Sequence, residues 1–222
     1  MGDFSKARVQ MVDNQIRPND ITDLGLIETF LNVPRELFVP QGKKAIAYSD
    51  ADIALSATDS DKDRYLFQPV TYAKLLDAAK IGHNDVVLCI GSGSGYGVAL
   101  MASLADSVVG IDQSEQLVEQ ANEALAALEI DNVAVLNSDH KAGNAKEAPF
   151  DVILIEGAVE EAPLALCDQL RDGGRLVTIL GTGLSAHVVV ITKKGEDISH
   201  VRRGNISAAL LPGFEKEAGF VF

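Results

Sequence analysis

The sequence contains no tryptophan, and aromatic residues make up only 5% of it. Surfaces that stack bases or sugars are built from such side chains, so their scarcity argues against this kind of binding. Basic residues are also few, because 19 Lys and Arg stand against 32 Asp and Glu and give a net charge of −13. Phosphate backbones repel such a surface, and we therefore expect no nucleic-acid partner.

Long apolar runs and clustered metal ligands are missing as well. No run approaches the roughly 20 apolar residues that a membrane-spanning helix needs, and the first residues lack the apolar core of a signal peptide. The two cysteines, Cys89 and Cys167, lie in apolar or helical patterns typical of buried thiols in a reducing compartment. The four histidines show no ligand spacing, so no metal is expected. These absences predict a cytoplasmic protein with no membrane partner.

Strands and helices alternate from Pro69 onward. Short apolar runs that suit strands covered on both faces occur at 86–90, 107–111, 133–136, 152–155 and 175–180. Helical patterns begin at Pro69, follow the capping Ser114 and cover 163–170, while 187–192 and 198–202 resemble the arms of an antiparallel hairpin. This alternation predicts an α/β fold with a doubly wound, mostly parallel, Rossmann-like sheet and an antiparallel C-terminal hairpin.

The first 64 residues have a different character. One helix is expected over 3–16, and a second begins after the capping Thr22 and ends at Val33 and Pro34. The polar stretch from Tyr48 to Arg64 is predicted to be a long loop. We therefore divide the chain into a helical N-terminal extension with a substrate-side loop, residues 1–64, and a cofactor-binding domain, residues 65–222.

A glycine-rich turn follows the first strand, in the segment DVVLCIGSGSGYG over 85–97. Glycine lets the backbone turn tightly and lets a ligand approach the main chain. A dinucleotide site requires G-x-G-x-x-G, but Tyr96 or Val98 stands where the third glycine belongs, and no P-loop motif is present. The spacing found, G-x-G-x-G at Gly91, Gly93 and Gly95, is the form seen in enzymes that use S-adenosylmethionine.

Acidic residues end the next two strands and strengthen this interpretation. Asp112 is placed to accept the ribose hydroxyls, as in the dinucleotide analogue, and Asp139 the adenine amino group. Both are also placed to cap the helices that follow. The predicted cofactor-binding residues are Gly91, Ser92, Gly93, Gly95, Tyr96, Asp112, Gln113, Asp139 and His140. Two of these have alternatives, because Tyr96 also suits packing at the helix start and His140 also suits the surface.

Most of the chain resembles the protein-L-isoaspartate (D-aspartate) O-methyltransferases. The resemblance lies in the lead-in that ends with VPRELFVP over 33–40, in AYSDADIAL, and in DNVAVLNSD, APFDVILIEGA and LRDGGRLV further on. It implies a class I methyltransferase fold, S-adenosyl-L-methionine as cofactor, and esterification of a carboxylate at damaged aspartyl sites. The implied partner is a protein or peptide carboxylate, or a small molecule.

The loop beside the reacting groups departs from that family. Its members carry a Thr-Ile-Ser-Gln-Pro-like loop whose hydroxyls lie by the methyl group, whereas this chain has Tyr65 and Phe67 at the hydroxyl positions, followed by Gln68. Arg64 suits a carboxylate acceptor through its fork of N–H groups, but a solvated charge among the neighbouring aspartates is favoured. The substrate-loop candidates are Arg64, Tyr65, Phe67 and Gln68, and no catalytic residue is predicted.

Two further acidic features have competing interpretations. Glu156 stands where the family usually has a small or uncharged residue, and it suits a base, a group repelling acidic acceptors or, preferably, a helix cap. Asp59, Asp61 and Asp63 alternate as in a calcium loop, but Arg64 and Val70 replace its required Gly and Glu. The sequence thus predicts an isoaspartyl-type methyltransferase, with a methyltransferase of another acceptor or a non-catalytic cofactor-binding module as alternatives.

Overall fold

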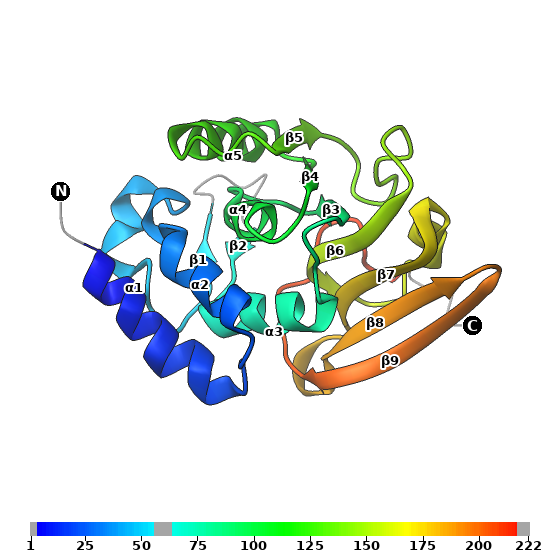
Figure 1. The fold of residues 1–222 in the computed structure, drawn as a ribbon, viewed down its shortest axis with the longest axis horizontal. Helices are drawn as coiled ribbons and strands as arrows, with labels where there is room; N and C mark the ends of the chain where they lie inside the picture. Colours follow the sequence, from blue (N-terminus) through cyan, green and yellow to red (C-terminus); the bar gives the residue numbers. More distant parts are fainter. Residues whose placement is uncertain (1–3, 56–63, 217–222) are drawn as a thin grey trace, which may run out of the picture.

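A seven-stranded sheet forms the centre of the computed structural model, which describes residues 4–55 and 64–216 (Figure 1). Its strand order is β5-β4-β3-β6-β7-β8-β9, and a separate antiparallel pair, β1 and β2, lies beside the N-terminal helices. The strands are β1 Ile53–Ala54, β2 Tyr65–Leu66, β3 Val86–Ile90, β4 Ser107–Asp112, β5 Val133–Asn137, β6 Phe150–Val159, β7 Leu170–Leu180, β8 His187–Lys194 and β9 Asp197–Asn205.

The sheet winds outward from β3 in both directions, which confirms the predicted fold class. β3 pairs in parallel with β4 and β6, and these in turn pair in parallel with β5 and β7. β7–β8 and β8–β9 are antiparallel, as predicted for the C-terminal hairpin. The central strands are apolar on both sides, since β3 is buried over its last four residues, and this matches the continuous apolar runs of a covered parallel sheet.

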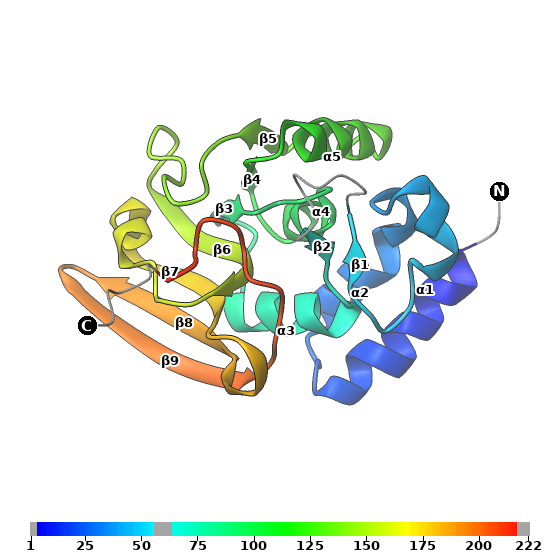
Figure 2. The ribbon, with the colours of Figure 1, turned by 180° about the vertical axis from the view of Figure 1, so that it is seen from behind.

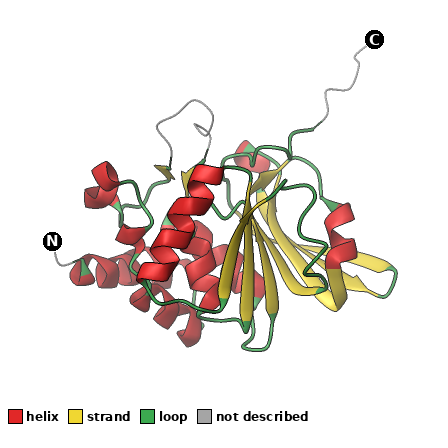
Figure 3. Ribbon diagram, turned by 90° about the horizontal axis from the view of Figure 1, so that it is seen from above, coloured by secondary structure: helices red, strands yellow, loops and turns green. Residues whose placement is uncertain are grey.

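The α-helices gather on one side of the sheet in Figure 3. They are α1 Ser5–Met11, α2 Leu24–Asn32, α3 Pro69–Ala79, α4 Tyr96–Ala102 and α5 Glu115–Ala127. Shorter helical turns are the π-helix η1 Val12–Ile16 and the 3₁₀ turns η2 Arg17–Asn19, η3 Arg35–Leu37, η4 Gln41–Ile46, η5 Leu164–Gln169 and η6 Gly183–Ser185. Pro69 at the first position of α3 and Ser114 as the cap of α5 were both predicted and are both confirmed.

The two faces of the sheet are covered unequally. Val87 and Leu154 on one face join a core to which all five α-helices contribute, whereas Leu88 and Ile153 on the other pack with η5 and the C-terminal tail. The helix predicted over 163–170 is present as the 3₁₀ turn η5, which ends at Gln169 because β7 already begins at Leu170. Ten residues connect β6 to β7, and a 3₁₀ turn covers more length per residue than an α-helix.

The N-terminal helices pack into the same core as the sheet, through residues such as Met11, Ile16 and Phe30. The cap of α2 was wrongly predicted, because Asp23 rather than Thr22 accepts the N–H of Leu26, at 3.0 Å. Both residue types cap helices, and the starting residue decides which of them is used. The division of the chain at residue 64 stays a prediction.

The structure also bears on the cysteines, on membrane-spanning helices and on metal ligands. Cys89 and Cys167 are buried free thiols, as expected. No helix within 4–55 and 64–216 is long and apolar enough to cross a membrane. The same residues contain no cluster of His, Cys, Asp and Glu able to hold a metal ion, and Asp59, Asp61 and Asp63 lie outside them.

Candidate cofactor and substrate site

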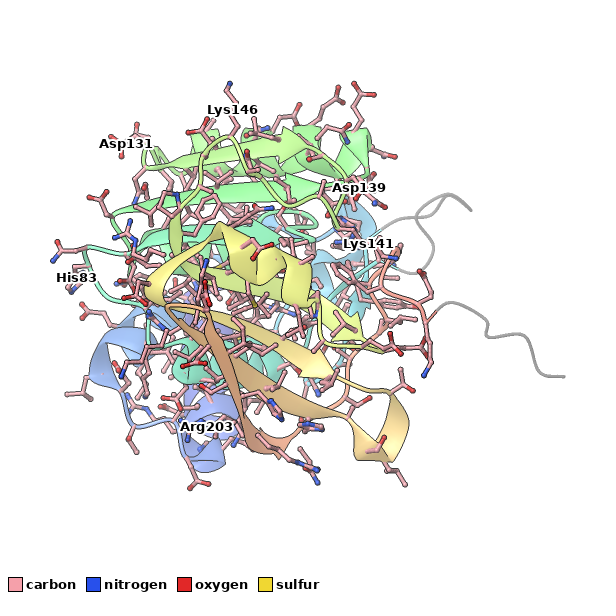
Figure 4. The ribbon with its side chains drawn as sticks, turned by 90° about the vertical axis from the view of Figure 1, so that its right-hand side faces the viewer. His83, Asp131, Asp139, Lys141, Lys146 and Arg203 are labelled. Carbon is pink, nitrogen blue, oxygen red and sulfur yellow. The ribbon has the colours of Figure 1, made fainter. Side chains whose placement is uncertain are left out.

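The glycine turn lies between β3 and α4, at the carboxyl ends of the parallel strands. Figure 4 shows Asp139 and Lys141 at this edge, while His83 and Asp131 lie at the opposite one. Gly91, Gly93 and Gly95 have φ angles of 77°, 53° and 92°, which L side chains rarely adopt. The turn therefore requires glycine at all three positions.

A buried hydroxyl within this turn is left without a partner. Among the described residues, the Oγ of Ser92 makes no hydrogen bond although Ser92 is only 1% exposed. Buried polar atoms are nearly always satisfied in native proteins, so an orphan of this kind suits contact with a ligand. This atom lies in the segment that the sequence assigned to the cofactor.

The carboxylate of Asp112 ends β4 and is completely buried. Its Oδ2 accepts the N–H of Gly93 at 2.8 Å, and its Oδ1 accepts the N–H of Ser114 at 3.0 Å. Burial raises the pKa of this carboxyl, but the His140 contact, the Arg64 charge and the Ser114 N–H together outweigh it and lower the pKa to about 2. The group is thus a fixed anion tied to the glycine turn.

Arg64 is the partner of this anion, and the prediction of a solvated charge is wrong. Its Nη2 lies 2.8 Å from Oδ2 of Asp112 and 2.9 Å from the carbonyl oxygen of Gly91, and the residue is 6% exposed. The carbonyl of Arg64 accepts the N–H of Leu55, which holds its backbone beside the turn. A buried anion favours an arginine over water as its partner, and no local pattern in the sequence reveals this contact.

Asp139, Gln113 and His140 form a second group at the same edge. Asp139 is exposed and accepts from the side-chain amide of Gln113 at 3.0 Å and from the N–H of Ala142, so it also caps the next turn. His140 is fully buried rather than on the surface. Its Nε2 lies 3.2 Å from the backbone N of Gln113 and 3.8 Å from Oδ1 of Asp112, and its Nδ1 lies 3.0 Å from the carbonyl oxygen of Pro212.

Glu156 caps no helix, contrary to the favoured interpretation. It lies within β6 and is 6% exposed, with Oε2 accepting the hydroxyl of Tyr72 at 2.9 Å and Oε1 accepting the thiol of Cys89 at 3.2 Å. Burial raises the pKa of this carboxyl to about 7, although the Cys89 and Tyr72 hydrogen bonds and the Arg64 charge oppose the rise. Within residues 4–55 and 64–216, its direct hydrogen-bond partners are thus two proton donors and no cation.

One glycine of α4 makes room for this carboxylate. A Cβ at Gly97 would overlap Oε1 of Glu156, so no larger residue fits beside the carboxylate as it stands. Gly97, in the segment GYGVA, lies inside α4, where no turn requires a glycine. An isolated glycine in a helix often marks close packing, and this is the signal in the sequence that points to the pocket of Glu156.

The substrate-loop residues are buried to different degrees. Phe67 is 2% exposed and its ring packs on that of Tyr72 with centroids 5.4 Å apart, while Tyr65 and Gln68 are half-buried. The carbonyl of Phe67 accepts from the buried guanidinium of Arg35, which lies over the ring of Tyr96. Tyr96 is fully buried and packs at the start of α4, the alternative that the sequence left open.

The C-terminal tail reaches the site from the far face of the sheet, where Figure 2 shows it passing the end of β6. Backbone hydrogen bonds fix it, from the N–H of Ala158 to the carbonyl of Ala209 and from the N–H of Leu211 to the carbonyl of Ala158, both 2.9 Å long, and from the N–H of Glu160 to the carbonyl of Phe214 at 3.2 Å. The side chain of Leu211 then fills the space against Gly91 and Gly157. No pattern in the sequence indicated that Leu211, Arg35 or Leu55 contributes here.

These residues can be compared with the needs of S-adenosylmethionine, which carries a ribose diol, an adenine and a methionyl group. The orphaned hydroxyl of Ser92 and the acidic pair Asp112 and Asp139 fit these groups. The fit has one exception, because Arg64 already binds the oxygens of Asp112 that ribose hydroxyls would use.

Comparison with known proteins agrees with the geometry. The family model described as protein-L-isoaspartate(D-aspartate) O-methyltransferase matches residues 6–212. A protein-L-isoaspartate O-methyltransferase of Geobacter metallireducens is 37% identical over 199 residues, 90% of this chain and 89% of that one. One from Syntrophus aciditrophicus is 34% identical over 206 residues, 93% and 92% of the two chains.

Solved structures share the fold. A protein-L-isoaspartate O-methyltransferase matches with a TM-score of 0.81 at 23% identity, over 93% of this chain and 66% of that one. A putative enzyme of the same kind from Plasmodium falciparum, in complex with S-adenosyl-L-homocysteine, matches with a TM-score of 0.75 at 21% identity, over 95% and 99% of the chains. With its family model covering nearly the whole sequence, this chain belongs to the protein-L-isoaspartate (D-aspartate) O-methyltransferase family.

Proposed function

We propose that this chain is a cytoplasmic S-adenosylmethionine-dependent methyltransferase that esterifies a carboxylate of damaged aspartyl residues in proteins. One observation carries the proposal. The glycine turn, Asp112 and Asp139 lie together at the carboxyl edge of the sheet, in a chain that matches the family over residues 6–212. In open α/β sheets this edge, outside the point where the strand order reverses, is where ligands bind.

The proposed reaction needs no general base, because a carboxylate acceptor is ionised at neutral pH. The cofactor supplies an activated methyl group when it is bound, and the chain has to align the acceptor and exclude water. Ser92 in the glycine turn and Asp112 would hold the part of the cofactor that lies against the turn, and Asp139 and His140 would lie by its adenine. Glu156 is no base in this account, since Tyr72 and Cys89 enclose its carboxylate.

On the acceptor side, the half-buried residues Tyr65 and Gln68 are those proposed to meet the peptide. Phe67 faces the core against Tyr72 and contributes a dry apolar wall rather than a hydroxyl. Losing a donor that orients a reacting oxygen typically costs about 2–4 kcal/mol of barrier. We therefore expect a slow enzyme whose specificity for the isoaspartyl linkage is kept.

The test uses two synthetic peptides that differ only in one linkage, isoaspartyl in the first and normal aspartyl in the second. Methyl transfer from labelled S-adenosylmethionine is measured as base-labile methyl ester, with an Asp112→Asn variant as the matched control. We expect label on the isoaspartyl peptide alone, and less with the variant. Equal labelling of both peptides, or cofactor binding without any transfer, contradicts the proposed acceptor.

A further inference from the structure

The ion pair between Arg64 and Asp112 lies inside the proposed cofactor site. Nη1 of Arg64 lies 3.4 Å from Oδ1 of Asp112, and Nη2 lies 2.8 Å from Oδ2. Both side chains are buried, with exposures of 7% and 1%. A guanidinium with both nitrogens directed at one carboxylate makes a charge-assisted, oriented contact, which is among the stronger polar contacts in proteins.

Among the described residues, the other contacts of Asp112 are two backbone N–H groups and the Nε2 of His140, which lies 3.8 Å from Oδ1. Gly93 donates to Oδ2 and Ser114 donates to Oδ1, so each carboxylate oxygen already accepts one backbone N–H besides the guanidinium. A carboxylate oxygen has about two good acceptor positions. The ribose diol of a nucleoside therefore finds no acceptor on Asp112 while Arg64 stays in place.

Two leucine side chains cover the glycine turn beside this ion pair. A Cβ at Gly93 would lie 2.9 Å from Cδ1 of Leu55, and one at Gly91 would lie 2.8 Å from Cδ1 of Leu211. The side of the turn that glycine leaves open for a ligand is thus filled by side chains of the chain itself. The N–H of Leu55 donates to the carbonyl of Arg64, so the two residues continue the antiparallel pairing of β1 with β2.

We propose that Arg64 is an internal occupant of the ribose subsite and sets the affinity for the cofactor, which binds Asp112 only by displacing the guanidinium. The inference rests on the proposed function and identifies a residue that the family resemblance does not assign. Only the fraction of molecules with Arg64 displaced is competent to bind, and the apparent dissociation constant rises by the inverse of that fraction. An occupant present in nine molecules of ten thus weakens binding about tenfold.

The opposite role is also chemically reasonable and is distinguished by experiment. In that role Arg64 binds the carboxylate of the methionyl group directly, and its removal weakens binding. Displacement and direct binding therefore predict changes of opposite sign in one measured quantity, the affinity for the ligand.

The test is calorimetric titration with S-adenosyl-L-homocysteine, which binds without turnover. We compare the wild type with Arg64→Ala and Arg64→Gln, and use Arg17→Ala as the control, since Arg17 forms an exposed ion pair with Asp13. We expect both Arg64 variants to bind about tenfold tighter or more, and the control to be unchanged. Unchanged or weaker binding by the Arg64 variants overturns the inference but leaves the proposed function standing. No detectable binding by the wild type or by any of the variants contradicts both.

A double-mutant cycle with Asp112→Asn shows whether Arg64 acts through this carboxylate. In the Arg64→Ala background the Asn substitution should weaken binding strongly, whereas in the wild type it also releases Arg64 and should weaken binding less. Non-additive effects are expected for residues in direct contact. Additive effects contradict a shared subsite.

The wild type alone supplies a second measurement, which does not depend on the variants being folded. The side-chain N–H signal of Arg64 can be followed by ¹⁵N NMR during titration with the same ligand, and assigned with Arg64→Lys. We expect this signal to move or broaden in step with binding. A signal that stays unchanged while the ligand saturates the protein overturns the inference.

Discussion

Replacing Glu156 by Gln should change how the stability of the protein depends on pH. The pKa of this carboxyl is raised from 4.5 to about 7 by burial, against the opposing effect of the Cys89 and Tyr72 hydrogen bonds and the Arg64 charge. A difference of about 2.5 units, at roughly 1.4 kcal/mol per unit, corresponds to about 3 kcal/mol of folding free energy linked to one proton.

The direction follows from which state holds the proton. Between pH 4.5 and 7 the folded chain keeps the proton on Glu156 while the unfolded chain has lost it, so rising pH favours unfolding. The contribution is complete below about pH 4.5 and is lost as the pH rises through about 7. Glutamine cannot titrate, and the variant should therefore gain about 3 kcal/mol relative to the wild type between pH 4.5 and pH 8.

Urea unfolding at several pH values measures this difference, followed by far-ultraviolet circular dichroism because the chain has no tryptophan. Glu28→Gln serves as the control, since Glu28 is exposed on α2 and should give curves parallel to the wild type. Curves for Glu156→Gln that stay parallel to the wild type, or that separate towards acid pH, would refute the assignment of a buried carboxyl whose pKa is raised to about 7.

Three other substitutions test neighbouring parts of the account. Gly97→Ala should cost about 2 kcal/mol or more of stability through its overlap with Glu156, and much of this loss should return in the double variant with Glu156→Ala, as thermal unfolding would show. Arg35→Met should cost about 3 kcal/mol or more in urea unfolding, because the Ala47 and Phe67 carbonyls lose their buried donor; a loss below 1 kcal/mol would contradict this. Gly91→Ala should abolish detectable binding of S-adenosyl-L-homocysteine in calorimetry, because φ is +77° and the methyl group would meet Leu211, and retained affinity would contradict the requirement for glycine.

The parts of the fold that the sequence predicted are those fixed by local patterns. The strand Val86–Ile90 is a run of apolar residues between a turn and a glycine turn, and Ser114 caps α5 by a bond to the N–H only three residues away. The acid at the end of β4 was likewise found from its position after a strand. Such signals lie within a few residues of what they determine.

The parts that the sequence did not predict depend on contacts between distant segments. Arg64 meets Asp112 across 48 residues, and Glu156 meets Tyr72 across 84. Arg64 among aspartates reads locally as a solvated charge, and Glu156 before a loop reads as a cap, because nothing nearby shows the buried partner. The cap of α2 failed for a different reason, since Thr22 and Asp23 are both competent caps and only the start of the helix selects between them.

A crystal structure of this chain with S-adenosyl-L-homocysteine tests the central claim most directly. The account predicts that the ribose hydroxyls are bound by Asp112, the adenine lies by Asp139 and His140, and the Arg64 guanidinium has left the position it holds 2.8 Å from Asp112. A ligand bound elsewhere, or an Arg64–Asp112 pair that stays intact beside the bound ligand, would contradict it.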